Sequence, residues 1–200
     1  MIRRERHRLR NALRRAVGFS TVELLAGLLI MGVIIAIAII QLEPAVQQIR
    51  ANSAMFLLSS QLRWARQSAI SQRRNFIVQF VGNNEITIFR QEQPTQALTQ
   101  VSDVRLNPMV FFQLTPSMPD TPDGYGNGGP VVFNGLVGGP PVMQFQSDGT
   151  FDDGNGNPIN GTVFMGITGI ATCGRAVTVL GATGRVRSFK SNGTGWITGQ

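Results

Sequence analysis

The stretch from Gly18 to Leu25 reads Gly-Phe-Ser-Thr-Val-Glu-Leu-Leu, and it joins an arginine-rich leader to an apolar run. The run extends from Leu24 to Ile40 without a charged residue, so a single carboxylate, that of Glu23, stands at its start. An ionisable group inside a bilayer costs about 2.5–3.5 kcal/mol on insertion scales and is a functional hypothesis by default. The stretch therefore indicates a membrane helix with a function beyond anchoring.

The leader differs from an ordinary secretory signal. Residues 1–18 hold seven arginines, one glutamate and the only histidine of the chain. A secretory signal has its small-residue cleavage site after the apolar core, but here the core is followed by Gln41-Leu42-Glu43-Pro44. Cleavage before the core would leave it on the mature protein. An uncleaved signal anchor is the alternative, although an anchor does not require Gly-Phe followed by Glu at this spacing.

The junction resembles the class III signal of type IV pilins and type II secretion pseudopilins. In that family a membrane peptidase cuts after the glycine and methylates the new N-terminal residue, usually a phenylalanine. The resemblance covers about the first quarter of the chain. It implies cleavage after Gly18, methylation of Phe19 and a role in assembly for Glu23.

Four segments are expected along the chain. They are a cleaved leader (1–18), a transmembrane and assembly helix (19–43), an amphipathic half of the same helix (44–74) and a β-rich globular domain (75–200). The apolar stretch is long enough for a bilayer span, which needs about 20 residues. Pro44 removes a backbone donor and clashes with the preceding turn, so we expect a helix kink there, near the membrane exit.

The second half of the helix carries an apolar stripe. Spacings of three and four residues place one side chain after another on the same face: Met55, Leu58, Leu62, Ala65 and Ala69. This face should pack on a globular partner. Phe56 and Trp64 lie away from the stripe. They either pack within an imperfect stripe or contact a neighbouring subunit, since large exposed apolar groups often mark interfaces.

Beyond Arg74 the apolar period changes from helical to alternating, which is typical of strands. Residues 75–80 and 85–90 flank Gly82-Asn83-Asn84 and predict a β-hairpin. Further strands are expected at 101–106, 109–114, 131–133, 142–146, 162–167, 176–180 and 185–190, with surface loops at 116–130 and 148–158. The predicted fold is α+β, a long kinked helix packed on an antiparallel sheet, as in type IV pilin-like proteins.

Two short motifs in the C-terminal half narrow the resemblance. Phe145-Gln146-Ser147-Asp148-Gly149-Thr150 precedes a strand, and the strand from Cys173 to Leu180 is followed by Gly184-Arg185-Val186-Arg187. This arrangement is similar to the H-type minor pseudopilins of type II secretion, a family that includes FimT-like minor pilins. The resemblance implies partners of three kinds: a prepilin peptidase and methyltransferase, other pilins or pseudopilins in a helical assembly, and the inner membrane.

The net charge of +7 is concentrated in the leader. Removing residues 1–18 takes away seven of 18 basic and one of 11 acidic residues, which leaves a mature chain of net charge +1. Positive charge stays in the cytoplasm, so we expect a single-pass inner-membrane protein whose N-terminus is cytoplasmic before cleavage. The C-terminal domain is then expected in the periplasm or in an extracytoplasmic pilus.

Catalytic and metal sites find little support in the sequence. The mature chain has no histidine and one cysteine, Cys173, which is expected to be a buried thiol rather than part of an intermolecular disulfide. The acidic loops around Asp120, Asp148 and Asp152 lack the ligand spacing of a calcium loop, and turn chemistry explains them better. We expect no cofactor, no metal and no enzymatic activity.

Two functions remain open. The first is that of a structural subunit of the pilus-like fibre of a type II secretion system. The second is that of a minor type IV pilin that binds DNA for uptake, with phosphate contacts from four cations: Arg175, Arg185, Arg187 and Lys190. Cations on an edge strand that discourage sheet-to-sheet pairing would explain the same residues without DNA.

Overall fold

The computed structural model describes residues 19–116 and 118–199, and the predicted leader lies outside them. The chain divides into two compact units, one ending at Glu43 and the other beginning at Pro44. Among the described residues of the first unit, helix α2 (Thr21–Gln72) supplies the regular structure, and it continues into the second unit with Pro44 inside it. A kink at Pro44 stays a prediction.

Helix α2 begins with a capped first turn. The backbone N–H of Val22 donates to the hydroxyl of Ser20 at 3.3 Å, and the N–H of Leu24 donates to the Ser20 carbonyl at 3.0 Å. Ser20 therefore stands at the N-cap of α2, where a hydroxyl satisfies a backbone donor that has no partner within the helix. The helix that begins there is long and apolar enough to cross a membrane.

The second half of α2 buries the predicted stripe. Each of its members is fully shielded from solvent: Met55, Leu58, Leu62, Ala65 and Ala69. The spacing of three and four residues is confirmed as a packing face, and α2 ends at Gln72, close to the predicted end of the helix at position 74.

Two antiparallel sheets form the rest of the second unit. The first has the order β3-β2-β1-β7-β8, formed by β1 (Phe76–Val81), β2 (Glu85–Gln91), β3 (Leu98–Arg105), β7 (Gln144–Phe145) and β8 (Phe151–Asp152). The predicted hairpin is its centre, with Phe76 opposite Arg90 and Val81 opposite Glu85.

The second sheet has the order β12-β11-β10-β9-β5-β6, with β4 pairing on β9. Its strands are β4 (Phe111–Phe112), β5 (Val131–Phe133), β6 (Leu136–Val137), β9 (Gly161–Gly166), β10 (Arg175–Leu180), β11 (Arg185–Ser191) and β12 (Trp196–Gly199). A 3-10 turn, η1 (Ala171–Cys173), leads into β10.

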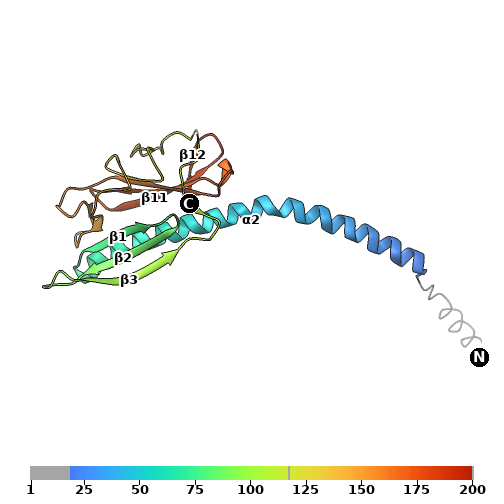
Figure 1. Ribbon diagram of the computed structural model, residues 1–200, viewed down its shortest axis with the longest axis horizontal. Coiled ribbons are helices and arrows are strands. Elements are labelled where there is room, and N and C mark those ends of the chain that lie inside the picture. The colour runs from blue at the N-terminus through green and yellow to red at the C-terminus, as the bar shows by residue number, and fades with distance from the viewer. Residues whose placement is uncertain (1–18, 117, 200) are drawn as a thin grey trace, which may run out of the picture. The chain divides into compact units, whose positions relative to one another are not determined.

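The second half of α2 contacts both sheets. Trp64 meets Phe76 of the first sheet edge to face at 6.0 Å between ring centroids, while Arg63 Nη2 donates to the Val186 carbonyl of the second sheet at 3.4 Å. Figure 1 shows β1–β3 and β11–β12 on opposite sides of this part of the helix. One apolar core joins the stripe to both sheets. The architecture is α+β, which confirms the predicted fold class.

The described part of the predicted surface loop at 116–130, from position 118 onward, covers the outer face of the second sheet. A second cluster of buried side chains, Phe164, Ala176 and Phe189, lies on that face. The loop is held to the sheet by several bonds, among them the indole N–H of Trp196 to the Pro119 carbonyl at 2.8 Å and the Thr178 hydroxyl to Asp123 at 2.6 Å. Strand β10 is therefore buried on both faces.

Candidate functional site

The predicted processing junction lies between Gly18 and Phe19, and the structure describes only Phe19 of the two. Gly18 lies outside the described residues. Phe19 precedes the helix and is 80% exposed. Cleavage and methylation at these two positions stay predictions.

Glu23 lies in the first turn of α2 and is exposed. With Ser20 at the N-cap, Glu23 occupies the N3 position, so Ser20-Thr21-Val22-Glu23 has the pattern of a capping box. A carboxylate in the first turn also interacts favourably with the helix dipole. This local role was open to sequence reasoning and was missed, and it competes with the assembly role that the resemblance implies.

The apolar segment after Glu23 is exposed and is not covered by any other described part of the chain. Every large apolar side chain from Leu24 to Ile39 is exposed, by fractions between 53% and 73%. Burying such a side chain away from water is favourable by about 1.5–3 kcal/mol relative to leaving it exposed. This exposed segment is long and apolar enough to cross a membrane.

Phe56 and Trp64 are half-exposed on the second half of α2, at 45% and 42%. Each also has a partner in its own chain. Lys190 Nζ stands 5.8 Å from the centre of the Phe56 ring, and Trp64 packs edge to face on Phe76. One side of each ring therefore packs internally and the rest faces solvent, and contact with a neighbouring subunit stays a prediction.

The prediction that Arg175 contacts DNA is corrected by its burial. Arg175 is 1% exposed, and its guanidinium donates to the side chains of Asn52 at 2.9 Å and Gln48 at 2.5 Å. It also donates to the carbonyls of Thr172 and Gly174 at 2.9 and 2.7 Å. Burial lowers the pKa of this guanidinium. Arg175 joins β10 to the helix and presents no surface to a phosphate.

The other three predicted DNA contacts do not form one patch. Arg185 is exposed, whereas Arg187 pairs with Asp123 of the loop that covers the sheet. Successive side chains of a strand point to opposite faces. Lys190 therefore faces the other side of β11 from the two arginines, and there it meets Phe56 of the helix.

The acidic loop after β8 is organised by its own side chains. The Asp153 carboxylate accepts from the backbone N–H of Asn155 at 2.9 Å and from the side-chain amide of Asn157 at 3.0 Å. These bonds, with that from Asn157 first, lower the pKa of Asp153 to about 2. Asp152 is buried, which raises its pKa. The bonds are those of a turn, as the sequence indicated.

The remaining titratable candidate is Cys173. Its thiol is buried at the end of η1 and is not in a disulfide, and burial raises its pKa. The predicted buried thiol is confirmed. Among the described residues, no group of three or more histidine, cysteine, aspartate or glutamate side chains is arranged to hold a metal ion.

The sequence matches no protein-family model, and no curated protein matches it. Similar chains are found among solved structures at low identity. The minor pseudopilin EpsH from the type II secretion system of Vibrio cholerae is 14% identical, over 70% of this chain and 97% of that one, with a TM-score of 0.46. The type IV minor pilin FimU of Pseudomonas aeruginosa is 15% identical, over 78% and 96%, with a TM-score of 0.47.

Proposed function

We propose that this chain is a minor pseudopilin, a structural subunit of the pilus-like fibre of a type II secretion system. The observation that carries the proposal is the uncovered apolar segment of α2 with Glu23 at its start. Before assembly the segment lies in the inner membrane, and in the fibre it packs among the equivalent helices of other subunits. The globular unit then stands outside the cytoplasm.

Processing by a prepilin peptidase is the first part of the proposal. The enzyme cuts between Gly18 and Phe19 and methylates the new amine. Intact-mass analysis of the chain extracted from membranes should show a protein that begins at N-methyl-Phe19. Gly18→Ala should be cut poorly. A native chain that still carries residues 1–18 would contradict the proposal.

Glu23 is the second part. In the fibre its carboxylate pairs with the free amine of Phe19 in an adjacent subunit, because two opposite charges offset each other's desolvation where either alone is costly. Glu23→Val should be processed normally yet fail to enter the fibre. Since Glu23 also occupies the N3 position of the helix, the loss of a cap could produce the same defect.

A matched variant separates these two causes. Glutamine serves at N3 as glutamate does, so Glu23→Gln keeps the capping pattern and removes only the charge. If pairing with the amine drives assembly, Glu23→Gln and Glu23→Val should both be excluded from the fibre. If Glu23→Gln enters the fibre normally, the role of Glu23 is helix capping, and its pairing with the amine of Phe19 is contradicted.

A minor type IV pilin that binds DNA is the second candidate, and the contacts of its four cations give it less support. Arg175 is buried, Arg187 is paired, and Lys190 faces the helix. Arg185 is the one member of the set whose guanidinium is free for a phosphate within the described residues. A single contact would give weak binding, so we favour the secretion fibre.

A further inference from the structure

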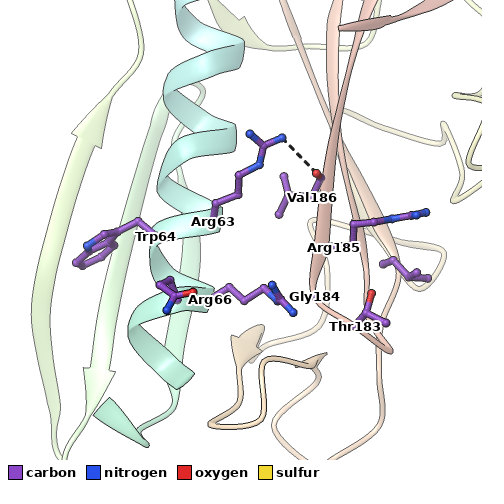
Figure 2. A pocket seen from close by; sticks show the side chains of 9 residues that line it. Arg63, Trp64, Arg66, Thr183, Gly184, Arg185 and Val186 are labelled. Carbon is purple, nitrogen blue, oxygen red and sulfur yellow. Dashed lines mark hydrogen bonds between the residues drawn. The ribbon is translucent and has the colours of Figure 1, made fainter. Parts of the chain in front are cut away.

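A groove of about 870 Å³ lies between the second half of α2 and the turn that joins β10 to β11. Arg63, Arg66 and Gln67 line its helix side, and residues 183–186 line its sheet side. Figure 2 shows Arg63 and Arg66 extending from the helix across the groove toward Val186 and Gly184, while Arg185 points away at the rim.

The two guanidinium groups in the groove have donors to spare. Arg63 donates to the Val186 carbonyl at 3.4 Å, and Arg66 Nε donates to the Gly149 carbonyl at 3.1 Å. A guanidinium carries five N–H donors. Neither group is within ion-pair distance of a carboxylate among the described residues, where the ion pairs are Arg90–Glu92, Arg105–Glu85 and Arg187–Asp123.

The surroundings of the groove are equally free of acid. None of its described lining residues is acidic, and the chain has no acidic residue between Pro44 and Arg74. Arg185 at the rim adds a further positive charge. Planar guanidinium groups bind carboxylates with two parallel hydrogen bonds, so the groove is complementary to a segment that carries carboxylates.

We propose that this groove docks a carboxylate-bearing segment of a neighbouring subunit. The inference rests on the proposed function, because that function places other subunits against this helix. A membrane headgroup is a poor occupant, since Arg63 follows Pro44 by 19 residues, about 28 Å along a helix at about 1.5 Å per residue. Duplex DNA would need an extended track of cations, but on β11 Arg187 is paired with Asp123 and Lys190 lies against Phe56, which leaves Arg185 alone beside the groove.

The sequence offers a direct test by zero-length cross-linking. Carbodiimide couples amines to adjacent carboxylates and leaves guanidinium groups unreacted, and Lys190 is the only lysine of the chain. Arg63→Lys therefore places a reactive amine in the groove. Arg73→Lys, exposed in the turn directly after α2 and outside the groove, is the matched control.

Membranes from cells that assemble the fibre should yield an intermolecular cross-link at position 63, absent from the wild type and from Arg73→Lys. Mass spectrometry should identify the partner carboxylate in another pilin-like subunit. An absent cross-link, or one formed only within the chain, would overturn the proposal. So would a cross-link to a protein of another class.

A binding measurement on the full chain in non-ionic detergent gives a second readout. A dye-labelled hexaglutamate peptide should bind at low salt. We expect Arg63→Gln/Arg66→Gln to weaken binding about tenfold, since an exposed ion pair accounts for about a two- to fivefold change. Arg73→Gln/Arg105→Gln removes the same charge elsewhere and should leave binding within about twofold of the wild type. Arg63→Gln alone, which keeps the Arg66 bond to Gly149, covers the case in which the double variant does not fold.

Three results of this measurement would overturn the proposal: no binding of the peptide, equal weakening in the control, or tighter binding of a thymidine hexanucleotide that the groove variants abolish. The last result would assign the groove to single-stranded nucleic acid. If these tests contradict docking in the groove, the proposed function is still supported as long as the chain is cut after Gly18 and enters the fibre. An unprocessed chain would instead remove the proposed function itself.

Discussion

Gly184 lies against the backbone of Gly149, so closely that a Cβ on Gly184 would overlap the Gly149 carbonyl oxygen. The two glycines belong to the two C-terminal motifs of the sequence, which are 35 residues apart. Arg66 of the helix completes the contact by donating to the same oxygen at 3.1 Å. The motifs therefore meet at one point, where the turns after β7 and β10 approach the helix.

Gly184→Ala should destabilise the globular unit by about 2–5 kcal/mol. Gly184 has φ +60, a conformation that costs other residues about 1–2 kcal/mol, and overpacking against a backbone oxygen costs about 1–3 kcal/mol more. Gly82→Ala is the control, because Gly82 has φ +59 with open space around it. Denaturation of the full chain in non-ionic detergent should show a clearly larger loss for Gly184→Ala. Equal losses would mean that the contact with Gly149 contributes nothing.

Arg175→Lys should destabilise the chain by about 2–4 kcal/mol. Lysine cannot reproduce the planar fork that reaches Asn52, Gln48 and two carbonyls, so buried acceptors would lose their donors. The exposed Arg185→Lys should change the free energy of unfolding by less than about 0.5 kcal/mol. Chemical denaturation of both variants tests the assignment. If Arg175→Lys leaves the free energy of unfolding unchanged, these bonds do not hold the helix to β10.

The burial of the helix stripe could be predicted because a single helix face packs on one core, and that imposes a period on the sequence. Leu58 and Leu62 follow this period, and both are fully buried. The two-residue strands β6 and β8 could not be predicted, because so short a segment carries no period. Strand β12, at the sheet edge, was missed as well.

The burial of Arg175 depends on partners that lie far away in the sequence. Its acceptors Gln48 and Asn52 precede it by 127 and 123 residues. The loop at 116–130, predicted only as surface, covers the opposite face of the same strand. Neither contact can be inferred from the charge of Arg175 or from the local pattern of the sequence. Glu23 is the opposite case, since the capping-box pattern that it forms with Ser20 spans only three residues and could have been recognised.

Asp153 should make the stability of the chain dependent on pH in the acid range. Its pKa is lowered from 3.8 to about 2, so the ionised form favours the folded state. This stabilisation is complete above pH 3.8 and is lost as the pH falls toward 2. Asp153→Asn should therefore be less stable than the wild type at pH 6, and the difference should vanish near pH 2. Asp103→Asn, an exposed aspartate on β3, controls for the change in net charge. A difference that persists unchanged at pH 2 would contradict this prediction.

Arg185 and Arg187 are two residues apart on β11, and we expect their replacements to act differently. Arg187 pairs with Asp123, whose side chain is 7% exposed, so Arg187→Gln leaves a shielded carboxylate without its cation. The loss should be about 1–3 kcal/mol, between the values for exposed and buried pairs. Arg185→Gln should leave stability unchanged.

A salt titration of duplex DNA binding on both variants tests the second candidate function. Each phosphate contact contributes about 0.9 to the slope of log affinity against log salt. Under the fibre proposal the wild type should not bind at low salt. If the wild type binds, and the slope of log affinity against log salt is smaller by about 0.9 in Arg185→Gln, the result would instead favour the DNA-binding pilin.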